Sequence, residues 1–208
     1  MIIMKNFWAR LISAVLHPLI MPSIAMVILF AIPSYVSFSV SSQAQRLILV
    51  IVFINTCLAP LLAIFFLKRI GVINSVLLDE RTDRIYPVLV SVFFYLFTYY
   101  LFRQANLPSV MSYFIMGATL LTLIGFIVTF YWKISIHMIS MGGFTGFLIA
   151  LSLLLRFEMA FLIILTILLS GLLGTARIKL NAHNPPQVYA GYITGVLVML
   201  LLFIYLRA

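Results

Sequence analysis

The chain has 208 residues, of which 65% are hydrophobic and only 8% are charged, and its formal net charge is +9. This composition excludes an ordinary soluble domain, which needs a polar surface toward water. The cations stand singly at the ends of apolar runs, which argues against nucleic acid as a partner. The apolar runs are continuous and do not alternate as in a lipid-facing β-barrel, so the composition predicts an all-α membrane protein in contact with lipids.

Seven apolar segments follow one another and predict a polytopic bundle of six to seven transmembrane helices. They lie at about residues 11–34, 46–67, 86–102, 109–131, 138–155, 158–175 and 187–206. The first carries His17, Pro18, Pro22 and Pro33, which predict a kink or a re-entrant turn, and it lacks a clear cleavage site. No linker divides the chain, so we expect a single domain with N-terminal helices over 1–85 and a motif-bearing core over 86–206.

Short connections at 103–108 and 156–158 predict two helical hairpins. Two crossings then separate each of the polar stretches 68–86, 132–137 and 176–186 from the next, so all three emerge on one membrane face. That face receives most of the ionisable side chains: Lys68, Arg69, Asp79, Glu80, Arg81, Asp83, Arg84, Lys133, His137, Arg177, Lys179 and His183. The sequence therefore predicts that any polar site lies on this face.

The first notable cluster joins Arg177 and His183, six residues apart, to a last helix that Pro186 can open. A helix N-terminus directs amide groups and a positive dipole at whatever precedes it, which suits a phosphate. A purely interfacial role also fits, in which the arginine snorkels and the histidine lies among headgroups.

The second cluster is Lys133 and His137, directly after the aromatic helix end Tyr131-Trp132. An aromatic belt followed by a lysine is ordinary membrane anchoring. A histidine at the start of an apolar run is less ordinary, because polar groups at that depth usually have a function.

Together these clusters resemble the second and third signature motifs of the PAP2 superfamily, the membrane phosphatases related to phosphatidic acid phosphatase and glucose-6-phosphatase. Ser135 and His137 match the Ser and His of a Pro-Ser-Gly-His motif. Arg177 and His183 match the spacing of Ser-Arg, five residues, His, three residues, Asp. The resemblance covers roughly half of the chain and implies a PAP2-like core.

The resemblance implies that His183 is the nucleophile and that His137 is the general acid. It implies that Arg177, Ser135 and Lys133 hold phosphate oxygens, and it implies neither a metal nor another cofactor. Imidazole suits both histidine roles because its pKa lies near neutrality.

The chain departs from the family pattern at Ala176, Ile136 and Gln187, which replace Ser, Gly and the Asp that orients the nucleophile. Glucose-6-phosphatase sequences also carry a glutamine at the last position, and its carbonyl can accept the imidazole N–H. The first motif, Lys, six residues, Arg-Pro, has no clean match. Its nearest counterpart is Arg84, with Arg81 as a second cation for the phosphate.

The resemblance therefore predicts a metal-independent hydrolase that removes phosphate from a lipid phosphate or a polyprenyl diphosphate through a phosphohistidine. The alternative is an inactive relative that binds an anionic lipid or a partner protein. Asp79 and Asp83 have the DxxxD spacing of membrane prenyltransferases, but the chain has only four acidic residues and lacks a second cluster. No internal repeat supports a transporter. Gly191 and Gly195 predict close helix packing, within the bundle or in a homo-oligomer.

Two arguments from the sequence place the site on opposite sides of the membrane. The motif face has nine cations and the opposite face four (Arg46, Arg103, Arg156 and Arg207), which by the positive-inside rule predicts a cytoplasmic motif face. The count is nearly level once the proposed phosphate ligands are left out. The resemblance implies a bacterial inner membrane with the site at the periplasmic face.

Overall fold

The computed structural model describes residues 6–73 and 81–207, without the side chains of residues 81–84 and 207. Within these residues the chain is all α-helical and contains no sheet. Among the described residues, six helices are long and apolar enough to cross a membrane, so the chain is an integral membrane protein. They are Ser42–Arg69, Ile85–Gln104, Ser109–Tyr131, Ile136–Leu155, Ala160–Lys179 and Pro185–Leu206. The chain forms two compact units, one of Met1–Met21 with Tyr131–Ala208 and the other of Pro22–Phe130.

The first apolar segment does not form one continuous helix of spanning length. It is divided into α2 (Phe7–Val15), α3 (Met21–Ala31) and the short α4 (Tyr35–Phe38). The break after α2 contains Pro18, which has no N–H and disfavours a helical conformation at the residue before it. The side chain of that preceding residue, His17, closes the turn, because its Nδ1 accepts a hydrogen bond from the Leu19 N–H at 3.3 Å.

The unit Pro22–Phe130 contains three of the long helices. α5 (Ser42–Phe53) and α6 (Ala59–Arg69) are joined by a π-helical turn, η1 (Ile54–Leu58), into one span. Pro60 lies two residues beyond this turn and cannot donate to the carbonyl four residues earlier, which explains why the helical ladder widens there. α7 (Arg81–Gln104) and α8 (Ser109–Tyr131) complete the unit.

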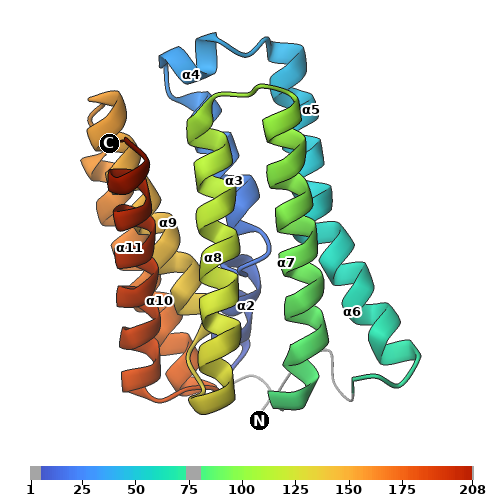
Figure 1. Cartoon of the computed structure of the whole chain (residues 1–208). Helices are drawn as coiled ribbons and strands as arrows, with labels where there is room; N and C mark the ends of the chain where they lie inside the picture. Colours follow the sequence, from blue (N-terminus) through green and yellow to red (C-terminus); the bar gives the residue numbers. More distant parts are fainter. Residues whose placement is uncertain (1–5, 74–80, 208) are drawn as a thin grey trace. The chain divides into compact units, whose positions relative to one another are not determined.

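The other unit is built on α9 (Ile136–Leu155), α10 (Ala160–Lys179) and α11 (Pro185–Arg207), which lie side by side (Figure 1). α9 and α11 approach most closely where α11 carries glycine. A Cβ at Gly195 would collide with the Ile139 carbonyl, and one at Gly191 would lie 2.8 Å from the Ser135 carbonyl oxygen. The Gly191 and Gly195 face therefore packs against α9 of the same chain, which is the within-bundle alternative of the sequence prediction.

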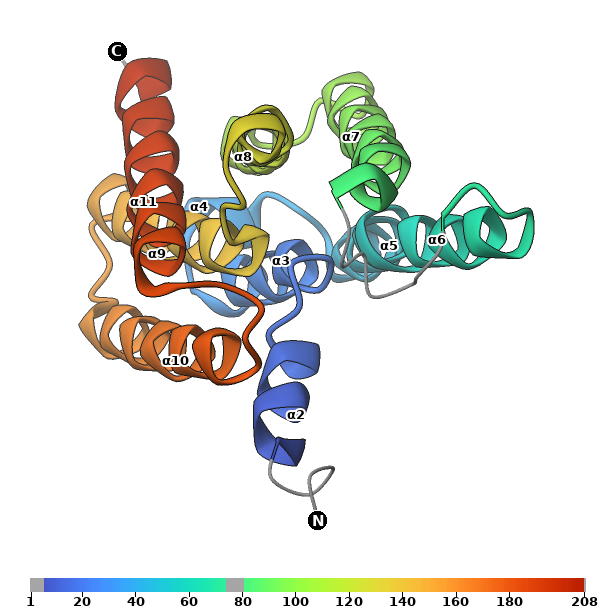
Figure 2. The same ribbon diagram turned by 90° about the horizontal axis from the view of Figure 1, so that it is seen from below.

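α2 belongs to the same unit as α9, α10 and α11. It packs against α10, close to the loop that leads into α11 (Figure 2). Its Ala9 and Ser13 are buried, whereas Phe7, Trp8 and Leu11 are exposed. This division into two faces is typical of a helix that lies at a membrane interface. The N-terminal segment thus reaches the polar end of the motif-bearing helices.

Candidate functional site

The turn after α10 explains the spacing between Arg177 and His183. Asn181 adopts a left-handed conformation (φ 52°), and the Ala182 N–H donates to the Arg177 carbonyl at 3.1 Å while the Asn181 N–H donates to the Ile178 carbonyl at 2.9 Å. These two bonds form a Schellman motif, which satisfies the last carbonyls of a helix. The His183 N–H reaches the same Arg177 carbonyl at 3.4 Å, so the turn fixes the backbone of His183 over the end of α10.

The next residues form the N-terminal cap of α11. The Gln187 N–H donates to Asn184 Oδ1 at 3.1 Å, and the Asn184 N–H donates to Gln187 Oε1 at 3.1 Å. This reciprocal arrangement is a capping box, and prolines fill the first two helical positions, where an N–H would lack an intrahelical partner. The cap fixes the side chain of Gln187 and identifies its oxygen, since only an oxygen can accept from the Asn184 N–H.

His183 is buried, and its Nδ1 contacts two oxygens, Gln187 Oε1 at 3.3 Å and the Lys133 carbonyl at 3.1 Å. Both oxygens are acceptors, so Nδ1 carries the proton and Nε2 carries the lone pair. The hydrogen bond from His183 to Gln187, expected from their spacing, is present. The contact to the main-chain carbonyl of Lys133, 50 residues away, was not expected from the sequence. The structure thus gives Lys133 a place in the site through its main chain.

Ser135 lies beside these groups, because its N–H donates to the Gln187 carbonyl at 3.3 Å. It occupies the N-cap position of α9, where a serine hydroxyl usually accepts from an amide of the first turn, yet it makes no such bond. Its Oγ is completely buried and has no hydrogen-bond partner in the part of the chain that the structure describes. A buried hydroxyl without a partner is costly, which marks this position as a candidate contact for a bound acceptor.

His137 lies in the first turn of α9, close enough to Arg177 and His183 to interact electrostatically with both. The structure adds a group that the sequence prediction did not assign to the site, the third histidine. The ring of His17 stands edge-to-face against that of His137, with centroids 5.2 Å apart and an interplanar angle of 85°. The only sequence signal for His17 was its position before Pro18 inside an otherwise apolar segment.

Several positively charged or positively polarised groups lie at this end of the unit. α9 and α11 both begin here, so the positive ends of two helix dipoles point to the site, and Arg177 adds a guanidinium from the last turn of α10. Burial, and to a smaller extent the charge of Arg177, lower the pKa of His17 to about 4, which keeps this ring neutral near pH 7. The arrangement is suited to an anion with several oxygens, such as a phosphate.

The predicted residues are thus divided. His183, His137, Arg177, Ser135, Gln187 and the carbonyl of Lys133 come together in one unit. The side chains of Arg81 and Arg84, with the Asp79 and Asp83 pair, lie outside the part that the structure describes, so their roles stay predictions. Within that part, no three His, Cys, Asp or Glu side chains gather closely enough to hold a metal ion.

Comparison with known proteins finds no matching family model, no matching curated protein and no matching solved structure.

Proposed function

We propose that this chain is a membrane phosphohydrolase that removes a phosphate group from a lipid phosphate or a polyprenyl diphosphate by way of a phosphohistidine. The observation that carries the proposal is the pair of acceptors at His183 Nδ1, which leaves the lone pair on Nε2. A histidine held in one tautomer by two oxygens is oriented as a nucleophile.

The remaining groups take the other roles of such a reaction. Nε2 of His183 attacks phosphorus, and the bond from phosphorus to the leaving oxygen breaks. His137 donates a proton to that oxygen, and later accepts a proton from the water that releases phosphate from the phosphohistidine. Arg177 and the buried hydroxyl of Ser135 stabilise the phosphate oxygens, where charge is highest in the transition state.

An amphiphilic substrate follows from the surroundings of the site. Exposed aromatic side chains are found at this end of the unit. Phe7 and Trp8 lie on α2, Tyr131 ends α8, and Tyr189 lies near the start of α11. Aromatic residues of this kind favour the interface between lipid tails and headgroups. A lipid phosphate at that depth has its headgroup at the site and its apolar chain in the bilayer.

The test is phosphate release by the purified protein in detergent, from a panel that includes a phosphatidic acid, a long-chain prenyl diphosphate, a water-soluble alkyl phosphate and an aryl phosphate. We expect turnover of the lipid substrates, and an acid-labile phosphate on His183 when a reaction is quenched with alkali and digested. Lys179→Gln, which removes an exposed cation from the same end, is the matched control and should behave as wild type. Absence of both release and phosphohistidine across the panel would favour the non-catalytic alternative.

A further inference from the structure

The N-terminal segment supplies two contacts to His137 that lie outside the three motifs, one from α2 and one from the turn that follows it. One is the His17 ring, edge-to-face at 5.2 Å between centroids. The other is a hydrogen bond between the His137 ring and the main chain of Ser13. Ser13 lies in the last turn of α2, where helix carbonyls lack intrahelical partners and are available as acceptors. His137 is thus held from the N-terminal segment as well as from its own helix.

Both contacts restrict the position of the His137 ring, the proposed proton donor. A ring nitrogen that donates to a carbonyl fixes the orientation of the imidazole, which a general acid needs. The ring of His17 is itself neutral near pH 7, since burial lowers its pKa to about 4 and its Nδ1 accepts from the Leu19 N–H. Among the described residues, the charged and titratable groups that act on His137 are Arg177 from α10, His183 from the following loop and His17 from the turn.

We propose that His17 is a positioning residue of the site, whose ring, together with the Ser13 carbonyl, orients His137 toward the leaving oxygen. This rests on the proposed function and assigns a role to a segment that none of the motifs includes. The proton that His137 transfers comes from the ring nitrogen opposite the one bonded to Ser13. Loss of the His17 ring lets the imidazole of His137 rotate, and a small misplacement of a reacting group slows a reaction strongly.

A general acid matters most when the leaving group is poor, and this separates positioning from mere structural support. An alkyl alcohol needs the proton, whereas an aryl alcohol leaves largely without it. A variant that misplaces His137 therefore loses activity on alkyl phosphates selectively. A variant that only destabilises the fold loses activity on both substrates by the same factor.

The experiment compares kcat for an alkyl phosphate and an aryl phosphate in wild type, His17→Asn, His17→Phe and the control Lys179→Gln. Asparagine keeps an acceptor for the Leu19 N–H but removes the ring, and we expect its kcat on the alkyl phosphate to fall about tenfold, with less than about a twofold change on the aryl phosphate. Phenylalanine keeps a ring and should restore alkyl phosphate turnover to within about threefold of wild type.

The outcomes are distinct. An equal loss on both substrates, or no loss on either in His17→Asn, overturns the positioning role while the proposed function stands. Failure of His17→Phe to restore turnover overturns it as well, provided that its melting temperature matches that of wild type. A wild type that hydrolyses neither substrate refutes the proposed function, and the role of His17 with it.

Discussion

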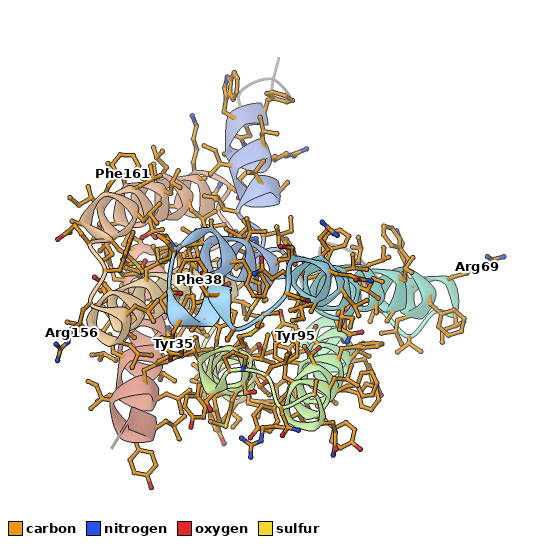
Figure 3. The ribbon with its side chains drawn as sticks, turned by 90° about the horizontal axis from the view of Figure 1, so that it is seen from above. Tyr35, Phe38, Arg69, Tyr95, Arg156 and Phe161 are labelled. Atoms are coloured by element: carbon orange, nitrogen blue, oxygen red, sulfur yellow. The ribbon has the colours of Figure 1, made fainter. Side chains whose placement is uncertain are left out.

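The connections on either side of α10 are both short, and both turn through a left-handed residue, Arg156 (φ 50°) before the helix and Asn181 (φ 52°) after it. The first connection makes only local bonds. The Phe157 N–H donates to the Ser152 carbonyl, the Ser152 hydroxyl donates to the Phe157 carbonyl at 2.8 Å, and Glu158 accepts from the Ala160 N–H at 3.0 Å. Arg156 is exposed and points away from the ribbon (Figure 3).

The second connection is bonded to a segment far away in sequence. His183 is buried and reaches the Lys133 carbonyl, and the Gln187 carbonyl accepts from the Ser135 N–H. Both connections thus turn through a left-handed residue and return an N–H to a carbonyl five residues earlier, which explains only how the chain reverses. What distinguishes the functional end is the docking of a second segment, which buries one histidine and holds it in one tautomer.

The largest contrast is expected from His183→Ala against Arg156→Ala. Removal of the nucleophile should lower kcat by a factor on the order of 1,000 or more and abolish the phosphohistidine. Arg156→Ala should stay within about twofold of wild type, because its side chain contacts no part of the site. Phosphate release and trapping of the intermediate measure both. Wild-type turnover in His183→Ala would mean that the nucleophile is misassigned.

Arg177→Ala should lower kcat/KM by about 100-fold, since a fixed cation at developing negative charge is lost. Arg177→Lys should recover part of this loss, because lysine keeps the charge without the planar fork. Neither change removes the main-chain carbonyl that holds the loop, so the melting temperature should stay near that of wild type. A fall in melting temperature parallel to the loss of activity would show that the arginine is structural.

Gln187→Ala removes both an orienting acceptor and half of the capping box. We expect about a tenfold loss of kcat together with about 1 kcal/mol of stability, the usual value of a helix cap. Gln187→Glu keeps the oxygen at the same reach and adds a negative charge beside the imidazole, so it should keep activity and stability. If both variants lose stability alone, Gln187 serves only as a cap.

Acidification should act on the end of the unit that contains His17. Its folded pKa of about 4 lies below the unfolded value of 6.5, so between these values the unfolded chain binds the extra proton. The contribution of His17 to stability is therefore fully present above about pH 6.5 and is lost as the pH drops toward 4. The melting temperature of wild type should decrease from pH 7.5 to pH 5 more than that of His17→Asn. An equal decrease in both proteins would contradict this origin.

The smallest expected effects concern the two left-handed residues themselves. Asn181→Ala should cost about 1 kcal/mol, because a Cβ without a local hydrogen-bonding side chain is disfavoured there, and Asn181→Gly only a few tenths. Arg156→Gly should gain about 0.5–1 kcal/mol for the same reason. Only the Asn181 variants should also change kcat, since only that turn carries site residues. Melting temperature and turnover, measured on the same samples, distinguish the two turns.

The class of protein and much of its local framework follow from the amino-acid sequence alone. Long apolar runs predict the six spanning helices, because backbone amides in lipid must be paired within a helix. The spacing of Arg177, His183 and Gln187 predicts their association, because residues joined by one turn or one helical turn stay close whatever surrounds them. The first segment was ambiguous, since apolar composition indicated a span while the residue before Pro18 indicated a break.

The contacts between elements distant in sequence follow only from the tertiary structure. The Lys133 carbonyl at His183, the buried Ser135 hydroxyl, and His17 against His137 join segments that no local rule relates. Such contacts depend on how closely α9 and α11 pack at Gly191 and on how α2 packs against α10. Packing complementarity between distant segments is a property of the folded whole, whereas caps and turns are encoded within a few residues.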